Sequence, residues 1–139
     1  RFFTFYGPWG RPDMALFLFT DKILKGEPID VYNNGNMKRD FTYVDDIVSG
    51  FTLALEKGKG YEIFNIGNGS PVPLMDFIAT IESELQQKAN INFMPIQPGD
   101  VPETSADISK AREVFGYEPK VGVPEGVKNF ITWYREYYR

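Results

Sequence analysis

Residues 37–57, MKRDFTYVDDIVSGFTLALEK, decide the fold because a strand pattern gives way to a helix pattern within them. Met37 to Tyr43 are strand-like and end on aromatic and β-branched side chains. Asp45 follows where a helix cap is expected, and the apolar side chains after it recur at helical spacing on one face: Ile47, Val48, Phe51, Ala54 and Leu55. This stretch predicts a strand followed by an amphipathic helix, which a pair of glycines ends.

A short polar turn separates this stretch from a second strand-like run. Residues 29–32 are strand-like, and the sequence Asn-Asn-Gly-Asn at 33–36 joins them to residues 37–43. Asn-Gly between two such runs is a strong hairpin signal, so we expect a β-hairpin here. Further upstream, Asp13 can cap a helix of about residues 14–25.

The chain opens on an aromatic run, Phe2 to Tyr6, that stops at the sequence Gly-Pro-Trp-Gly-Arg-Pro at 7–12. This pattern predicts a buried strand that runs into a rigid turn. The start has no initiator Met, long apolar stretch or cleavage site, so we interpret it as the middle of a strand rather than a targeting segment. The longest apolar run, Met14 to Phe19, is far too short to span a bilayer.

The rest of the sequence alternates strand and helix patterns. We expect a strand over 61–66, a helix over about 74–88, a strand over 91–94 and a loop over 95–102. A short helix follows, which Asp107 caps and Gly116 ends. The last helix starts at about Glu125 and directs these side chains inward: Val127, Phe130, Ile131 and Tyr134. Strands that alternate with helices indicate an α/β fold, and the hairpin makes its sheet mixed.

Composition excludes several classes of protein. The 139 residues suit a single domain, and the contents of 42% hydrophobic and 16% aromatic residues argue against disorder. With 15 Lys and Arg against 19 Asp and Glu, the net charge of −4 argues against a nucleic-acid binder. The chain has no His and no Cys, which excludes a Ser-His-Asp triad, a thiolate nucleophile, a zinc cluster and disulfides. We therefore expect no metal site, and the lack of disulfides fits a reducing compartment such as the cytoplasm.

A glycine-containing turn after the predicted strand 61–66 has the position of a dinucleotide-binding loop. The sequence Gly-Asn-Gly-Ser-Pro-Val at 67–72 follows a strand and precedes a helix. However, Val72 stands at the third glycine, Pro71 and Pro73 crowd the helix start, and no acidic residue lies about twenty positions on to hold a ribose. We interpret this segment as an ordinary strand-to-helix turn.

Two arginines and one aspartate are candidates for ligand contacts. Arg11 lies in a turn stiffened by prolines, and Arg39 lies on the return strand of the predicted hairpin. A guanidinium on rigid backbone suits bidentate binding of phosphate or carboxylate. Asp100 lies in a loop shaped by Pro and Gly, where a carboxylate can be aimed at a ligand hydroxyl. Solvated surface arginines and a turn-forming aspartate are the alternatives. We interpret Asp45 and Asp46 as a helix cap and a helix-dipole partner rather than as paired catalytic carboxylates.

Four segments together resemble a known family. They are RFFTFYGPWGRPDMA at 1–15, KRDFTYVDD at 38–46, FNIG at 64–67, and QPGDV at 97–101 leading to ADISKA at 106–111. In order and spacing they resemble the C-terminal half of the extended short-chain dehydrogenase/reductases, the nucleotide-sugar epimerase/dehydratase group, and within it the UDP-glucuronate 4-epimerases. The resemblance implies that residues 1–139 form a single substrate-binding lobe, with residues 1–10 as the last strand shared with an NAD-binding Rossmann half outside this sequence.

The resemblance also implies roles for single residues. Arg39 corresponds to the arginine that holds the diphosphate, and Asp100 to the acidic residue near the nucleoside ribose. Thr4 stands where galactose epimerases usually carry Asn, and Thr4 with Arg11 resembles the pattern in which a hydroxyl and a guanidinium meet a sugar carboxylate. Many relatives carry Arg where this chain has Gln97, so a second diphosphate contact is missing or replaced by an amide, as expected of the glucuronate branch.

For the cofactor, the resemblance implies NAD, held mainly by the half outside this sequence, with Tyr6, Gly7 and Pro8 closing over its nicotinamide end. The catalytic Tyr-x-x-x-Lys motif of the family does not occur in this sequence, so we expect no catalytic residue here and no turnover by this chain alone. The implied reaction is transient C4 oxidation of a UDP-sugar, rotation of the ketose and return of hydride to the other face, in a complete enzyme that is a homodimer. A UDP-glucuronate decarboxylase, a sugar-nucleotide dehydratase and a free-standing binding module are the alternatives.

Overall fold

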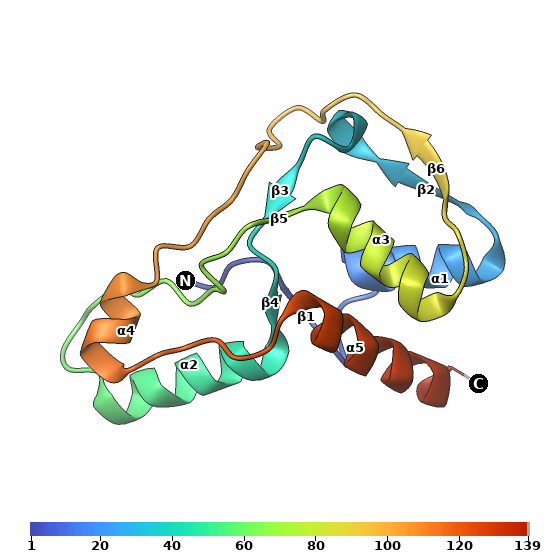
Figure 1. Ribbon diagram of the computed structural model, residues 1–139. Helices are drawn as coiled ribbons and strands as arrows, with labels where there is room; N and C mark the ends of the chain where they lie inside the picture. The colour runs from blue at the N-terminus through green and yellow to red at the C-terminus, as the bar shows by residue number, and fades with distance from the viewer. Residues whose placement is uncertain (139) are drawn as a thin grey trace.

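The strands of the computed structural model, which describes residues 1–138, form three short pairs rather than one continuous sheet (Figure 1). Two pairs are parallel, β1 (Phe5–Tyr6) with β4 (Thr42–Tyr43) and β2 (Pro28–Val31) with β6 (Asn90–Phe93); β3 (Lys38–Arg39) and β5 (Val72–Pro73) are antiparallel. The α-helices are α1 (Ala15–Lys25), α2 (Val44–Lys57), α3 (Leu74–Leu85), α4 (Ser109–Phe115) and α5 (Val123–Tyr137). The predicted α/β class with mixed strand directions is confirmed.

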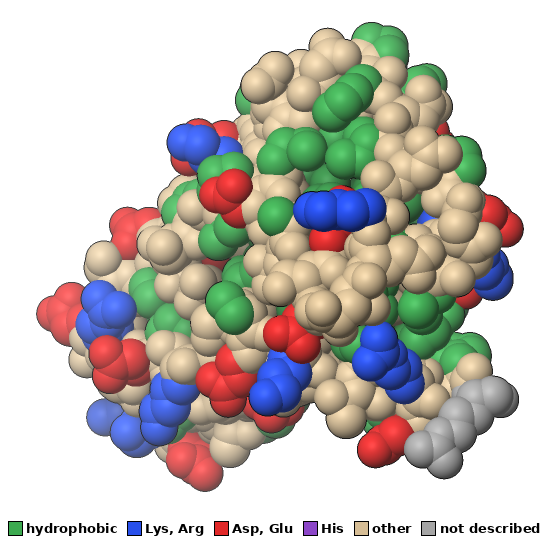
Figure 2. Space-filling model, turned by 45° about the vertical axis from the view of Figure 1, so that its right-hand side comes forward, with side chains coloured by type: hydrophobic (Ala, Val, Ile, Leu, Met, Phe, Trp, Pro, Cys, Tyr) green, Lys and Arg blue, Asp and Glu red, His purple; other side chains and the backbone are tan. Residues whose placement is uncertain are grey.

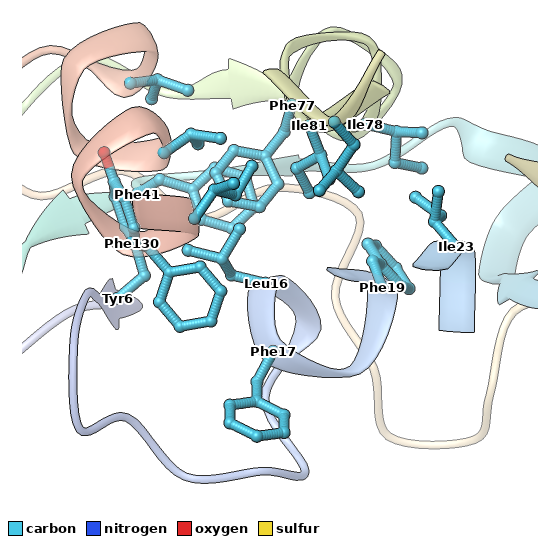
Figure 3. Close-up of a cluster of buried hydrophobic side chains, with 14 of the residues drawn as sticks. Tyr6, Leu16, Phe17, Phe19, Ile23, Phe41, Phe77, Ile78, Ile81 and Phe130 are labelled. Atoms are coloured by element: carbon cyan, nitrogen blue, oxygen red, sulfur yellow. The ribbon is translucent and has the colours of Figure 1, made fainter. Parts of the chain in front are cut away.

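The larger core lies where α1, α3 and α5 meet (Figure 3). In this view, side chains of α1 face side chains of α3 across the core: Leu16, Phe19 and Ile23 on one side, Phe77, Ile78 and Ile81 on the other. Phe41 stacks on Phe77 with ring centroids 3.9 Å apart and planes 8° apart. Each such side chain stabilises the fold by about 1.5–3 kcal/mol through burial. The inward face predicted for the last helix is also confirmed, because Val127, Phe130, Ile131 and Tyr134 are buried on α5.

A second core lies between α2 and α4, at the other end of the molecule in Figure 1. Its buried members are Ile47, Ile66, Ala106, Ile108, Ala111, Phe115 and Tyr117. Tyr117 is fully buried, and its hydroxyl donates a hydrogen bond of 2.8 Å to the carbonyl of Gly67. This bond leaves the buried hydroxyl satisfied. The pairs β1–β4 and β3–β5 lie between the two cores (Figure 1).

One buried carboxylate joins the middle of the molecule to two distant loops. Asp40 follows β3 directly and has 0% of its surface exposed. Its oxygens accept hydrogen bonds from the backbone N–H groups of Asn68 (2.7 Å), Gly69 (3.0 Å) and Ala106 (2.8 Å) and from the hydroxyl of Thr42 (3.2 Å). Several charge-assisted bonds of this kind are what make a fully buried carboxylate tolerable. Asp40 therefore holds the loop before β5 and the segment before α4 against β3.

Asp46, beside the second core, is another buried carboxylate that accepts hydrogen bonds from the backbone of a distant segment. It is 5% exposed, and its oxygens accept hydrogen bonds from the N–H groups of Lys120 (2.9 Å) and Val121 (3.0 Å). Asp46 also lies in the first turn of α2, as the dipole interpretation requires. The segment between α4 and α5 is thereby tied to the start of α2.

The three aspartates predicted as helix caps are not the N-cap residues. The N-cap residues of α2 and α1 are Tyr43 and Met14, and neither helix has a side-chain cap. Asp45 is exposed on the first turn of α2, and Asp13 forms an ion pair with Arg11 instead of capping α1. The N-cap residue of α4 is Ile108, again without a side-chain cap, although Asp107 Oδ1 accepts a hydrogen bond of 3.0 Å from the N–H of Ser109, the first residue of the helix.

The predicted hairpin at residues 33–36 is wrong, although the turn itself has the expected backbone. Asn33 and Asn34 adopt φ angles of 51° and 50°, the left-handed conformation that Asn tolerates. The strands on either side nevertheless separate, because β2 pairs with β6 and β3 pairs with β5. In that register Ile29 lies opposite Ile91, and Ile29 is fully buried. Apolar burial against β6 thus outweighs the local turn signal.

The predicted buried strand at the start of the chain is only partly confirmed. Tyr6 is buried, but Phe2 and Phe5 are 52% and 44% exposed, and only Ile66 of the predicted strand 61–66 forms a bridge, to Phe2. The apolar face predicted for α2 is also divided: Ile47 is buried, whereas Val48, Phe51 and Leu55 are exposed. Phe2 and Phe51 touch edge to face at 6.5 Å. We call Phe2, Phe5, Val48, Phe51 and Leu55 the α2 apolar surface.

Within residues 1–138, no helix combines the length and the apolar character that a membrane crossing requires.

Replacing Asp40 with Asn should lower the free energy of unfolding by about 3 kcal/mol, because the amide NH2 group faces N–H donors and leaves some of them unpaired. The measurement is a urea unfolding curve of the full-length protein. Asp45→Asn is the matched control, because Asp45 is an exposed aspartate on the neighbouring helix. Equal unfolding midpoints for the two variants would contradict the role assigned to Asp40.

Candidate functional site

A cleft of about 250 Å³ opens beside β3, and we call it the Arg39 cleft. Three of the residues singled out in the sequence line it, namely Thr4, Arg39 and Asp100. Its other lining residues are Asp13, Ala15, Leu18, Phe19, Asp30, Tyr32, Met37, Phe41 and Leu74. These residues come from four separate parts of the chain, so only the tertiary structure brings them together. A mostly apolar wall with a few polar groups is the usual composition of a small-molecule site.

The guanidinium of Arg39 is held at the edge of this cleft by the loop after β6. Its Nη2 donates to Asp100 Oδ1 at 2.8 Å, and its Nη1 donates to the carbonyl oxygens of Lys38 (2.9 Å) and Pro102 (3.3 Å). The backbone supports the same contact, because the N–H of Lys38 donates to Pro102 at 2.8 Å. The side chain of Arg39 is 16% exposed and that of Asp100 is 33% exposed. Arg39 is therefore positioned by its neighbours and not a freely solvated arginine.

Thr4 is placed in the cleft by the pairing of β1 with β4. Its carbonyl oxygen accepts a hydrogen bond of 3.0 Å from the N–H of Thr42, next to the register pair Phe5 and Thr42. Thr4 itself is half-buried and lines the cleft. Thr4 and Arg39 therefore line the same cleft.

Arg11 does not line the Arg39 cleft, and its partner Asp13 does. Arg11 borders a neighbouring apolar cavity of about 100 Å³, and its side chain is 75% exposed. Its Nε donates to Asp13 Oδ1 at 3.0 Å, and its Nη2 donates to Asp13 Oδ2. This bidentate contact raises the pKa of Arg11 and lowers the pKa of Asp13. Arg11 is therefore connected to the Arg39 cleft only by its ion pair with Asp13, which lines that cleft.

The residues predicted to lie near a nicotinamide border a different cavity. Tyr6, Gly7 and Pro8 line a cavity of about 370 Å³ together with Phe5, Trp9, Gly10, Tyr43, Val44 and Asp45. Tyr6 is buried, and this burial raises the pKa of its hydroxyl well above the usual range. The nearby Tyr43 makes a smaller contribution that also raises this pKa. Gly7 has φ of 146°, and a Cβ there would lie 2.6 Å from Cγ1 of Val44. The close contact explains why glycine stands at this position.

Two further expectations have clear outcomes. Gln97 is exposed and lines none of the three cavities described above, so the structure does not bring it together with Arg39. The turn at 67–72 is an ordinary turn, as predicted, because the N–H groups of Asn68 and Gly69 donate to Asp40. A dinucleotide-binding loop would use these N–H groups to bind phosphate, but here they are already bonded to Asp40.

Sequence reasoning missed three residues of the cleft, namely Asp13, Asp30 and Tyr32. Asp13 was interpreted only as a helix cap, although its position two residues after Arg11, with a proline between them, favours a turn that brings the two side chains together. Asp30 lies on β2 and accepts a hydrogen bond of 2.7 Å from Asn92 of β6. No local signal marks Asp30 or Tyr32, since the pairing of β2 with β6 places them.

Charged side chains of both signs are distributed over the surface (Figure 2). On the face drawn in Figure 2, acidic and basic side chains are interspersed and do not gather into a single basic patch. Among residues 1–138, no group of three or more acidic, His or Cys side chains could hold a metal ion.

Known proteins of similar sequence and structure are nucleotide-sugar epimerases and dehydratases. The sequence model described as the NAD dependent epimerase/dehydratase family matches residues 1–67. UDP-glucuronate 4-epimerase 2 of Arabidopsis thaliana is 47% identical over 156 residues, which cover 100% of this chain and 36% of that protein. The crystal structure of a UDP-glucuronic acid 4-epimerase from Bacillus cereus, in complex with UDP-glucuronic acid and NAD, superposes with a TM-score of 0.93 at 36% identity, covering 99% of this chain and 45% of that one.

A dehydratase is similar as well. The dTDP-glucose 4,6-dehydratase of Bacillus anthracis, solved in complex with NAD, has a TM-score of 0.89 at 25% identity, and the match covers 98% of this chain and 43% of that one. The chain thus spans less than half the length of each of these proteins.

Replacing Gly7 with Ala should lower the free energy of unfolding by about 3 kcal/mol, because the new methyl group meets Val44 and the backbone conformation is strained for an L-residue. Gly26→Ala is the control: Gly26 also has a positive φ, 71°, but nothing lies within 4 Å of its Cβ position. We expect a loss of about 1 kcal/mol for the control. Urea unfolding of both full-length variants checks this, and equal losses would show that the contact with Val44 is unimportant.

Proposed function

The chain belongs to the NAD-dependent epimerase/dehydratase family, and we propose from this premise that it is the substrate-binding lobe of a UDP-glucuronate 4-epimerase. The observation that carries the proposal is the Arg39 cleft, in which a positioned guanidinium, a hydroxyl and a carboxylate converge from distant parts of the chain. These groups match the three polar parts of a UDP-uronic acid: the diphosphate, the sugar carboxylate and the ribose.

Arg39 is the proposed diphosphate ligand. Two backbone carbonyls already orient its guanidinium, so little side-chain freedom is lost when an anion binds. A diphosphate can replace Asp100 on Nη2, and a charge-assisted bond to phosphate is at least as strong as the one that it replaces. An anchor at the diphosphate also keeps the nucleotide in place while a sugar rotates about its link to it.

Thr4 and Arg11 are the proposed ligands of the sugar carboxylate. Thr4 contributes a small hydroxyl on the cleft wall, and Arg11 contributes a guanidinium at its margin through the turn that includes Asp13. A hydroxyl with a guanidinium distinguishes a carboxylate from a neutral hydroxymethyl group, because only the carboxylate accepts a bidentate charged contact.

Asp100 is proposed to accept a hydrogen bond from a ribose hydroxyl once Arg39 binds the diphosphate. Asp100 lines the cleft and accepts a hydrogen bond from Arg39 there, which supports this role. Gln97, which is exposed on the same loop, is proposed as a neutral amide contact to the diphosphate that forms when the ligand is bound.

The nicotinamide end of NAD is proposed to lie in the cavity beside Tyr6, Gly7 and Pro8. The aromatic walls from Phe5, Tyr6 and Tyr43 suit a flat ring. These residues would contact one end of the cofactor by packing and through backbone groups. When bound, NAD accepts a hydride from C4 of the sugar and returns it to the other face.

The division of labour with the rest of the protein is also a proposal. The α2 apolar surface leaves five large apolar side chains partly exposed around the start of the chain, which suits packing against another part of the same polypeptide. We therefore propose that residues 1–10 join this lobe to a cofactor-binding part that supplies the catalytic Tyr and Lys. This chain alone would bind and orient substrate without turning it over.

The second candidate is a UDP-glucuronate decarboxylase or a sugar-nucleotide dehydratase, and the similarity to a dTDP-glucose 4,6-dehydratase supports it. The products separate these reactions. Incubating the full-length enzyme with UDP-glucuronate and NAD should give UDP-galacturonate. Release of carbon dioxide would instead establish a decarboxylase.

Replacing Arg11 with Ala in the full-length enzyme should weaken binding of UDP-glucuronate by about 10- to 100-fold, because a charge-assisted bidentate contact is lost. Binding of UDP-glucose, which has no carboxylate, should change by less than about threefold. Calorimetric titration of both ligands measures the two dissociation constants. Arg112→Ala, at an exposed arginine of α4, is the control and should leave both unchanged. Equal weakening of both ligands by Arg11→Ala would remove the carboxylate role.

A further inference from the structure

The contact between Arg11 and Asp13 occupies only one edge of the guanidinium. Asp13 takes the Nε–H and one N–H of Nη2. An arginine has five N–H donors, so two on Nη1 and one on Nη2 remain. Within residues 1–138, no hydrogen bond to those three groups is present. The free Nη1–Nη2 edge is itself a fork that matches the two oxygens of a carboxylate.

The turn that carries both residues makes this arrangement local and stiff. The N–H of Met14 donates to the carbonyl of Arg11 at 3.1 Å, which closes a β-turn with Pro12 at its second position. Proline has a fixed φ, so Arg11 and Asp13 keep their relative positions. Asp13 lines the Arg39 cleft, whereas Arg11 borders the cavity beside it. Asp13 is therefore the group that links Arg11 to the cleft.

Without Asp13, nothing else in the described structure restrains the end of the Arg11 side chain. The Arg11 side chain is 75% exposed, and within residues 1–138 its hydrogen bonds go to the two oxygens of Asp13 alone. A long exposed side chain loses rotamer freedom when a ligand orders it, which weakens binding. A carboxylate that holds the guanidinium beforehand removes part of this cost.

We infer that Asp13 is a positioning residue that holds Arg11 by its Nε–Nη2 edge and leaves the Nη1–Nη2 edge to bind the carboxylate of a sugar nucleotide. The inference rests on the proposed function, because it assumes that Arg11 meets that carboxylate. It assigns to Asp13 a share in selecting acidic over neutral sugars. Asp13 itself does not touch the substrate in this arrangement.

The test is the variant Asp13→Asn in the full-length protein, with dissociation constants for UDP-glucuronate and UDP-glucose measured by calorimetry. Asn keeps the size of Asp but loses the charge and one acceptor. We expect the dissociation constant for UDP-glucuronate to rise about tenfold, the size expected for ordering one arginine side chain. The constant for UDP-glucose should change by less than about twofold.

Two further variants separate positioning from a structural role. The double variant Arg11→Ala with Asp13→Asn should bind UDP-glucuronate no more weakly than Arg11→Ala alone, because Asp13 acts only through Arg11. Asp13→Glu keeps a carboxylate and should restore part of the affinity. Glu62→Gln is the matched control: it removes the acidic partner of another exposed ion pair, with Lys110, outside the Arg39 cleft, and should change neither constant.

Three results would overturn the inference. Tighter binding of UDP-glucuronate by Asp13→Asn would show that Asp13 competes with the ligand for Arg11. Equal weakening of both ligands would show that Asp13 only supports the turn. In the third result, Arg11→Ala weakens binding of UDP-glucuronate more than binding of UDP-glucose, but Asp13→Asn does not. This result would refute the role of Asp13 and leave the proposed function intact. If Arg11→Ala itself fails to discriminate, the proposed carboxylate site is wrong.

Discussion

The carboxylate of Asp40 is the interaction on which the rest of the structure depends. A charge without any exposed surface is tolerable only when donors surround it, and Asp40 has three backbone N–H groups and one hydroxyl. The three N–H donors come from two loops that lie 28 to 66 residues away along the chain. The loops can satisfy Asp40 only in one arrangement, so a single side chain selects the path of both.

This constraint has a direct consequence for the candidate site. Arg39 immediately precedes Asp40, so the residue proposed to bind the diphosphate is attached to a buried residue that hydrogen bonds hold in place. Arg39 then orders the loop at 100–102 through its own hydrogen bonds. The guanidinium of Arg39 is largely buried at the cleft, whereas Arg11 is exposed outside it and depends on Asp13 for its orientation. Tertiary contacts thus position one arginine, and a local turn positions the other.

The sequence predicts the helices well and the strand partners poorly. Helical periodicity is local, so the inward face of α5 follows from residues close together in the chain. Strand pairing joins residues far apart, and the Asn-Gly turn could not reveal that β2 pairs with β6. The same limit applies to the site: Arg39 and Thr4 were recognisable, but nothing local placed Asp30 or Tyr32 in the cleft. The apolar stripe of α2 could not be interpreted fully from the sequence either. Such a stripe indicates that a helix face is buried, but it does not identify the element that covers the face.

By itself, the sequence determined the α/β class, the helices, and a set of residues whose chemistry suits an acidic sugar nucleotide. It did so because periodicity, turn residues and short motifs depend on neighbours in the chain. The tertiary structure alone decided that Asp40 is buried among amides, that Arg39 pairs with Asp100, and that Arg11 meets the cleft only through Asp13. Each of these depends on where the chain brings a charge and its partners in space. Burial and counter-charge, rather than spacing along the chain, fix the geometry in which a charged group is held.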